Sequence, residues 1–212
     1  MLDRDTRCRV LEAAGPIFAA RGFEAASVRE ICDKAGANIS AVNYHFRSKE
    51  QLYVEAVRHA YESVAERVPL PTFPPEMPPR ERLRLFVRTM LQRLEFAETG
   101  WQGDLIMREV THPTGGACAE FVRDFVRPAF GMLQSILDGL LPPDVPVEKR
   151  RLLAQSVMGQ VLHRHHARHV IRLLLGEQEH GRITADAWAD HVTEFTLAAL
   201  ERLYPRGNGD RR

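Results

Sequence analysis

The stretch Ser27–Gln51, SVREICDKAGANISAVNYHFRSKEQ, decides the fold of this chain. Ser27 and Glu30 have the spacing of a capping box, in which a hydroxyl and a carboxylate satisfy the first amides of a helix. An apolar stripe at helical spacing follows, made of Val28, Ile31, Cys32 and Ala35. Gly36 stands where a helix end favours positive φ. We therefore predict a short helix over Ser27–Ala35 that ends at Gly36.

A second short helix is predicted over Ile39–His45. Asn38 is a favourable N-cap for it, and Ser48 with Gln51 forms another capping box that opens a third helix. A helix this short is unstable alone, so its neighbours must hold it. The two short segments indicate a helix-turn-helix whose second helix is presented outward.

The second helix carries side chains suited to nucleic acid. Val42 and Phe46 are its candidate inward anchors, and the other positions are small or polar. An amide such as that of Asn43 can pair bidentately with a base edge, and small side chains allow close approach to a base or phosphate. We predict base-facing positions at Ser40, Ala41 and Asn43, and phosphate donors at Tyr44, His45 and Lys49.

Residues 35–52 read A–G–x–N–x–S–x–x–x–Y–H–F–x–S–K–E–x–L and resemble the DNA-binding signature of the TetR family of bacterial regulators. Phe18, Gly22 and Phe23 fit the same pattern, and the resemblance covers about residues 5–58. Many family members have Tyr at the position of Asn43, so either Asn43 or Tyr44 is the phosphate or base contact. The DNA-binding residues that the resemblance implies are Ser27, Arg29, Asn38, Ile39, Ser40, Ala41, Asn43, Tyr44, His45 and Lys49.

The resemblance implies an all-α homodimer with an N-terminal helix-turn-helix domain and a larger helical domain for ligand binding and dimerisation. The expected divisions are a DNA-binding domain over 1–67, a Pro-rich linker over 68–79, a helical domain over 80–205 and a disordered tail over 206–212. Two long helices, Val147–Leu175 and Thr184–Tyr204, would form the dimer seam. The expected interface stripe consists of Trp188, Val192, Phe195, Ala199 and Leu203.

The composition is that of a globular protein and does not by itself indicate nucleic-acid binding. The formal net charge is +1, and residues 1–50 hold eight Lys and Arg against seven Asp and Glu. The DNA argument therefore rests on motif geometry. Three scattered cysteines with no signal peptide indicate reduced thiols and a cytoplasmic protein, and no uncharged run is long enough to span a membrane.

Helical periodicity runs through most of the chain. We predict a helix over Asp5–Arg21 with a kink at Pro16, and one from Ser48 to about Arg67. Residues 69–79, PLPTFPPEMPP, contain six prolines and are either a movement-transmitting spacer or a surface loop. Further helices are predicted over Arg80–Glu98, Trp101–Thr111, Ala117–Leu141 (with a possible kink at Pro128), Val147–Leu175 and from Thr184 onward. Between the last two, 176–182 reads as a polar connector.

One short segment combines aromatic, soft and polar side chains, as small-molecule pockets do. Arg108 and His112 are four residues apart and share a helix face. The candidate pocket consists of Trp101, Met107, Arg108, His112, Phe121 and Phe125, and the alternative is ordinary core with a surface arginine. Phe130 is a further aromatic at the same helical spacing.

The run His163–His169 offers a second binding hypothesis. Imidazoles three and four residues apart can bind zinc, copper or nickel. Arg164 and Arg168 would repel a cation, and no carboxylate or thiol lies within the run. The alternatives are a polar helix near a subunit contact or hydrogen bonds across a dimer seam.

We interpret the chain as a regulator, most simply a repressor, that binds a near-palindromic DNA operator as a dimer and is released by an unidentified small molecule. No nucleophile motif, phosphate-binding loop or zinc-protease motif occurs, so we expect neither an enzyme nor a cofactor. The alternatives are a metal-responsive regulator using His163–His169, or a helical binding or catalytic protein whose head docks on another protein.

Overall fold

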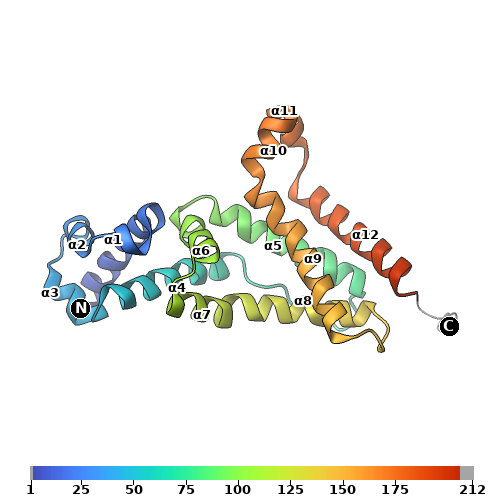
Figure 1. Cartoon of the computed structure of the whole chain (residues 1–212), viewed down its shortest axis with the longest axis horizontal. Coiled ribbons are helices and arrows are strands. Elements are labelled where there is room, and N and C mark those ends of the chain that lie inside the picture. The colour runs from blue at the N-terminus through green and yellow to red at the C-terminus, as the bar shows by residue number, and fades with distance from the viewer. Residues whose placement is uncertain (1, 206–212) are drawn as a thin grey trace. The chain divides into compact units, whose positions relative to one another are not determined.

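The computed structural model describes residues 2–205, and all regular structure within them is helical. This confirms the all-α prediction; the expected tail, 206–212, lies outside the described residues. In order, the helices are α1 (Leu2–Ala25), α2 (Val28–Ala35), α3 (Ile39–Phe46), α4 (Lys49–Arg67), α5 (Pro79–Ala97), α6 (Trp101–Thr111), α7 (Gly115–Phe121), the π-helix η1 (Val122–Val126), α8 (Arg127–Leu140), α9 (Val147–His166), α10 (Arg168–Leu175), α11 (Glu177–Arg182) and α12 (Ala185–Leu203) (Figure 1).

Packing divides the chain into two compact units. One contains residues 1–69 and 96–127, and the other contains 70–95 and 128–212. This division differs from the expected domains, because α6, α7 and η1 pack with the N-terminal helices rather than with the C-terminal ones. Each unit has its own hydrophobic core.

The first unit is built around α1, α4 and α6. Phe18 of α1 is fully buried and meets Tyr53 of α4 edge to face, with ring centroids 5.0 Å apart. Gly15 lies against the indole ring of Trp101, so that α1 and α6 approach closely. Gly22 has φ 76° and interrupts the helical backbone of α1, as expected, although a further turn follows it.

In the second unit, the Pro-rich segment is held against the start of α5. The Arg82 guanidinium donates to the backbone carbonyls of Met77 and Pro75 at 2.8 and 2.7 Å. Leu70 and Phe73 pack against the core of this unit. The segment is therefore an anchored surface loop, as one of the two sequence-based alternatives proposed.

The helix expected over Ala117–Leu141 is three consecutive elements. It starts two residues early, at Gly115, and a π-turn intervenes, in which the Arg127 amide donates to the Val122 carbonyl. Pro128 has no amide with which to continue the α-helical ladder at this point. The irregularity therefore precedes the proline that was expected to cause a kink.

The prediction of one helix over Val147–Leu175 was wrong. Ala167 has φ −91° and ψ 3°, which ends α9 at His166 and starts α10 at Arg168. The connector expected over 176–182 contains a further short helix, α11. Gly176 turns the chain between α10 and α11 with φ 80°.

Acidic and basic side chains face each other along α5 and α12. Arg84 pairs with Asp190 and Arg88 with Asp186, and a longer contact joins Arg80 to Glu194 at 3.7 Å. The residues on each helix repeat every four positions, so they share one face. This ladder fixes the register of α12 along α5.

Candidate nucleic-acid interface

Helices α2 and α3 are joined by a tight turn with the expected cap chemistry. Gly36 adopts the left-handed conformation with φ 61°, and the Ala37 amide donates to the Cys32 carbonyl at 3.0 Å. The Asn38 side chain accepts from the Ala41 amide at 2.8 Å, and Ser48 caps α4 by accepting from the Gln51 amide at 3.3 Å. These bonds set the angle between α2 and α3.

The predicted side-chain cap at Ser27 was wrong. Ser27 has the extended backbone of an N-cap, but its hydroxyl makes no capping bond. Glu30 instead forms an ion pair with Arg21 of α1 at 3.0 Å. The carboxylate therefore links α2 to α1 and does not close a capping box.

Helix α3 is held by two side chains and presents the rest of its surface outward. Val42 and Phe46 are buried in the core of the first unit, and the Arg7 guanidinium lies 5.3 Å from the centre of the Phe46 ring. Tyr44 is 74% exposed, the highest value among the large apolar and aromatic residues of this unit. A short helix anchored on one side and solvated on the other is suited to entering a groove.

The structure brings the predicted contact residues onto one surface region formed by α2, α3 and the start of α4. The exposed members are Ser27, Arg29, Asn38, Ile39, Ser40, Asn43 and Tyr44, and the half-buried ones are Ala41, His45 and Lys49. Asn38 also caps α3, so its side-chain oxygen has a structural bond. The remaining exposed groups are open to a ligand outside the chain.

Lys49 has a structural role that sequence reasoning missed. Its Nζ donates to the Glu24 carbonyl at 3.1 Å and lies 4.7 Å from the centre of the Phe23 ring. The side chain therefore ties the start of α4 to the end of α1. An ammonium has three donors, so a phosphate can still be bound alongside the carbonyl.

Arg47 is a further candidate that sequence reasoning missed. It is exposed, follows α3 directly and adopts φ 66°, which is uncommon for a residue other than glycine. Its amide donates to the Asn43 carbonyl at 3.1 Å and so ends the helix. Its position as a basic residue between the aromatic anchor Phe46 and the cap Ser48 could have identified it as a candidate from the sequence.

The candidate ligand residues are only partly brought together. Arg108 and His112 line a cavity of about 230 Å³ together with the Gly22 turn, Phe23 and Tyr53, and they join Met107 in lining a second hollow. Trp101 packs against Gly15 instead. Phe121 and Phe125 stack 5.5 Å apart beside Tyr61, as core aromatics do.

Arg108 and Glu109 join α6 to its neighbours through polar contacts. Arg108 donates to the carbonyls of Ala19 and Ala20 near the end of α1, at 3.1 and 3.2 Å. Glu109 is fully buried and accepts from the Tyr53 hydroxyl at 2.8 Å and from the Thr114 amide at 2.7 Å. Burial, and then the bond to Glu109, raises the pKa of Tyr53.

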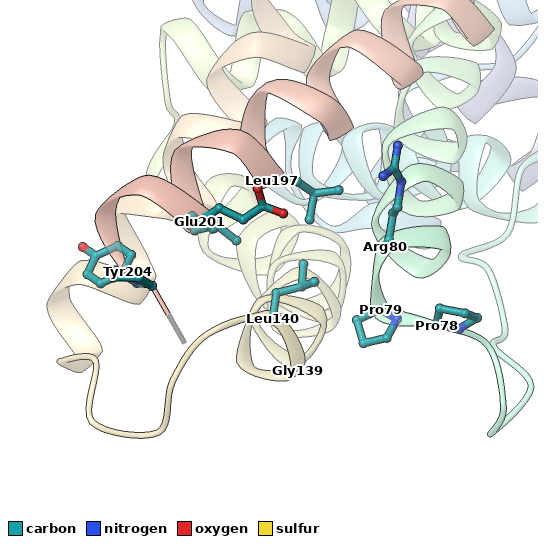
Figure 2. A pocket seen from close by; sticks show the side chains of 10 residues that line it. Pro78, Pro79, Arg80, Gly139, Leu140, Leu197, Glu201 and Tyr204 are labelled. Carbon is teal, nitrogen blue, oxygen red and sulfur yellow. The ribbon is translucent and has the colours of Figure 1, made fainter. Parts of the chain in front are cut away.

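The second unit contains a cavity that sequence reasoning did not find. It has a volume of about 480 Å³ and lies where the start of α5, the end of α8 and the end of α12 meet. Figure 2 shows Leu140 and Leu197 in its wall, with Arg80 and Glu201 beside them. This cavity is separate from the candidate pocket around α6.

The residues of the stripe expected to form a dimer contact do not all lie on an exposed face of α12. Val192 is 0% exposed and belongs to the core of its own unit, whereas Phe195 and Leu203 are well exposed. Trp188 and Ala199 are half-buried. Val192 turns inward because it lies near the face of α12 that carries the buried Ala189 and Thr196.

The histidine run does not form a metal centre. His165 is buried, the ring of His166 bonds to the Leu162 carbonyl, and His169 lies beyond the break on α10. Over residues 2–205, no group of three or more His, Cys, Asp or Glu side chains converges as metal ligands. The assembled site that the metal-responsive alternative requires is therefore not found in this part of the chain. Nor does any described helix have the length and apolarity needed to cross a membrane.

Two family models match the chain. The model of bacterial regulatory proteins of the tetR family matches residues 10–56, and the model of the C-terminal domain of the HTH-type transcriptional dual regulator CecR matches residues 79–202. The first match contains α2 and α3 with their caps. The second covers more than half of the chain.

Curated relatives resemble only part of the chain. The HTH-type transcriptional repressor KstR2 of Mycolicibacterium smegmatis is 42% identical over 52 residues, which are 24% of this chain and 25% of that protein. The HTH-type transcriptional activator FasR of the same organism is 32% identical over 104 residues, covering 48% of this chain and 46% of that one. The matches thus span between a quarter and half of these relatives.

Solved structures share the fold over nearly the whole chain. A bacterial regulatory protein of the tetR family from Rhodococcus matches with a TM-score of 0.64 at 18% identity, covering 92% of this chain and 96% of that one. A putative fatty acid metabolism regulator from Clostridium perfringens matches with a TM-score of 0.61 at 19% identity, covering 90% and 97%. With a tetR-type N-terminal region, a CecR-type C-terminal region and this shared fold, the chain belongs to the TetR family of transcriptional regulators.

Proposed function

We propose that the protein is a dimeric transcriptional regulator that binds a near-palindromic DNA operator through α3 and is released by a small molecule. The observation that carries the proposal is the orientation of α3. Val42 and Phe46 fix it to the core, while Asn43 and Tyr44 face solvent. Besides Ile39 and Tyr44, the outward positions of this helix carry small or polar side chains, which suit close approach to a DNA groove better than a protein-docking surface.

The exposed groups sort into two kinds of DNA contact. Ser40, Ala41 and Asn43 stand on the outer face of α3 and suit base edges. Ser27, Arg29, Tyr44, His45 and Lys49 surround that face and suit phosphates, and Arg47 extends the set beyond the end of α3. Base contacts would set the sequence preference, and phosphate contacts would set the register and the salt dependence.

A dimer explains why one short helix suffices. A single α3 reads only a few base pairs, whereas a two-fold dimer reads two half-sites about one helical turn apart. The exposed side chains of Phe195 and Leu203 on α12, with Leu152 on α9, support a seam formed by these two helices. Gly159 of α9 faces open space, since a Cβ added there would meet nothing within 4 Å. Because it has no side chain, a helix of the second protomer could approach α9 closely at this point.

Helix α6 is the element through which a ligand would act on the first unit. Arg108 binds the end of α1 two residues before Gly22, and Glu109 binds α4 through Tyr53. A small molecule that displaces Arg108 from these carbonyls would alter how α1 and α4 are held. Its effect is limited by its differential affinity for the two conformations, so a tenfold change in operator affinity needs about 1.4 kcal/mol.

Repression is the direction that we propose. KstR2 and NicS, two of the matched relatives, are named repressors, although FasR is named an activator and CecR a dual regulator. A repressor needs only to occupy DNA that the polymerase requires. The position of the operator relative to the promoter tests this directly.

Selection from a randomised DNA library tests the proposal. Full-length protein should enrich a consensus of two inverted half-sites, with a centre-to-centre spacing of about one helical turn. Asn43→Ala should alter the consensus, whereas Lys149→Ala, which changes an exposed lysine of α9, should not. Enrichment of no consensus would contradict sequence-specific binding.

A further inference from the structure

The α10–α11 arm, residues 168–182, is a helical hairpin at the end of α9 (Figure 1). Its two helices pack mainly on each other and on α9. Arg172 pairs with Glu177 at 3.5 Å across the Gly176 turn, and Arg168 donates to the His165 carbonyl at 3.1 Å. Polar contacts therefore shape one side of this hairpin.

The other side of the α10–α11 arm is apolar and uncovered. Val170, Leu173 and Leu174 are 66%, 74% and 78% exposed, and no residue of α10 is buried. Val170 and Leu174 are four residues apart and share a face with Ile171. Leu173 and Leu174 are the most exposed large apolar side chains among the described residues.

Such a helix needs a partner surface. An eight-residue helix is unstable in isolation, and amphipathic helices gain most of their stability from burying the apolar face. No other part of residues 2–205 buries this face. A contiguous apolar patch of this kind marks an interaction site.

The arm is continuous with the proposed dimer seam. It connects α9 to α12, the two helices whose exposed side chains form that seam. A two-fold axis that runs perpendicular to α9 and α12 sets each of these helices antiparallel to its copy. The end of α9 that carries the arm then lies beside the partner's α9 start and α12 end.

The receiving end carries exposed apolar side chains of its own. Val147 and Leu152, near the start of α9, are 53% and 54% exposed, and Leu203, at the end of α12, is 63% exposed. Each chain thus has two uncovered apolar surfaces. The α10–α11 arm lies at one end of the seam helices, and the exposed side chains near the start of α9 and the end of α12 lie at the other. That is the pattern a self-complementary two-fold contact requires.

We propose that the α10–α11 arm docks on a second copy of this chain, with Val170, Leu173 and Leu174 covering Leu152 and Leu203 of the other protomer. This inference rests on the dimer of the proposed function. The arms extend the seam of α9 and α12, and each protomer both donates and receives one.

Directed cross-linking tests the contact. Two variants are made in a background with Cys8→Ser and Cys118→Ser, one carrying Leu173→Cys and the other Leu203→Cys; the remaining thiol, Cys32, is buried. After subunit exchange, a short bis-maleimide should join the two variants into a covalent heterodimer. Replacing the second variant with Asp33→Cys, an exposed position on α2, should give little of this product.

A charge substitution tests the energetic contribution. Leu174→Glu should raise the dissociation constant of the dimer by about a hundredfold. A two-fold dimer contains the substituted side chain twice, and we expect each copy to raise the constant by about tenfold. Gln178→Glu, at an exposed position of α11 outside the apolar triplet, should change it by less than about threefold. Sedimentation velocity over a dilution series measures both constants, and circular dichroism checks that the variants fold.

The outcomes separate the arm from the dimer itself. A heterodimer cross-link together with a selective effect of Leu174→Glu supports the inference. A stable dimer with no cross-link and equal behaviour of the two charge variants overturns it and leaves the proposed function standing. A monomeric protein, or binding of the arm to DNA or another protein instead, overturns it as well, and a monomer also contradicts the dimer of the proposed function.

Discussion

At the scale of single residues, the best-defined polar contact is the one between Tyr53 and Glu109. The carboxylate is fully buried and accepts hydrogen bonds from the Tyr53 hydroxyl, the Thr114 hydroxyl and the Thr114 amide. The local sequence does not mark Glu109 for this role. Its structural role depends on α4 and α6 packing together, which no local pattern reveals.

The Glu109→Gln substitution should lower the free energy of unfolding by about 1–3 kcal/mol. The amide that replaces one carboxylate oxygen is itself a donor, so it would face donors inside the core. Urea unfolding at neutral pH measures the loss. Glu66→Gln, at an exposed position of α4, should change stability by less than about 0.5 kcal/mol, and an equal loss in both variants would contradict the role of Glu109.

Tyr53 makes stability depend on alkaline pH. Its pKa is raised in the folded protein, so the folded state holds the phenolic proton more tightly than the unfolded chain. The stability that this contributes is complete below about pH 10, the ordinary tyrosine value, and is lost as the pH rises above it. Tyr53→Phe should therefore flatten the decline above about pH 10, whereas Tyr44→Phe should not. Urea titrations at several pH values test this, and identical slopes in both variants would argue against it.

Lys49 combines a structural bond with a proposed phosphate contact. Lys49→Ala should weaken binding to all DNA sequences and lower the salt slope of binding by about one. It should also lower the free energy of unfolding by about 1 kcal/mol, because the bond to the Glu24 carbonyl is lost. Lys149→Ala is the matched control and should leave both quantities unchanged. A stability loss without a change in salt slope would leave Lys49 only its structural role.

At the scale of helices, the sequence predicted best those helix ends that are determined by neighbouring residues. Gly36, Asn38, Ser48 and Thr184 acted at helix ends as expected, because a cap is decided by neighbouring residues. The break at Ala167 was missed, since no glycine or proline marks it and helical periodicity continues past it. The placement of α6 and α7 in the first unit was also missed, because long-range packing decides it.

The contact of α1 with α6 depends on one glycine. A Cβ at Gly15 would overlap the Trp101 indole ring, which is too large to yield without moving α6. Gly15→Ala should therefore lower the free energy of unfolding by about 1–3 kcal/mol, despite the better helix propensity of alanine. Gly131→Ala in α8, where a Cβ meets nothing within 4 Å, should be neutral or stabilising by up to about 1 kcal/mol. Equal thermal unfolding curves for the two variants would contradict the close approach.

At the scale of the whole molecule, the proposed regulator requires three surfaces of one chain to act together. In this proposal the α3 face reads DNA, and the exposed faces of α9 and α12 with the α10–α11 arm pair two chains, while the contacts of Arg108 tie α6 to α1. Arg108→Gln should thus lower operator affinity by about tenfold even though the side chain faces the end of α1 rather than the DNA-binding surface, whereas Arg67→Gln, at an exposed position at the end of α4, should not.

The measurement that tests the central claim most directly is a fluorescence-anisotropy titration of the full-length protein against DNA from upstream of its own gene. A scrambled fragment of the same length and composition serves as the control, at two salt concentrations. We predict nanomolar binding to the native fragment, tighter than binding to the scrambled one by about a thousandfold or more. Equal, steeply salt-dependent binding to both fragments, or no binding at low salt, would contradict an operator-specific regulator.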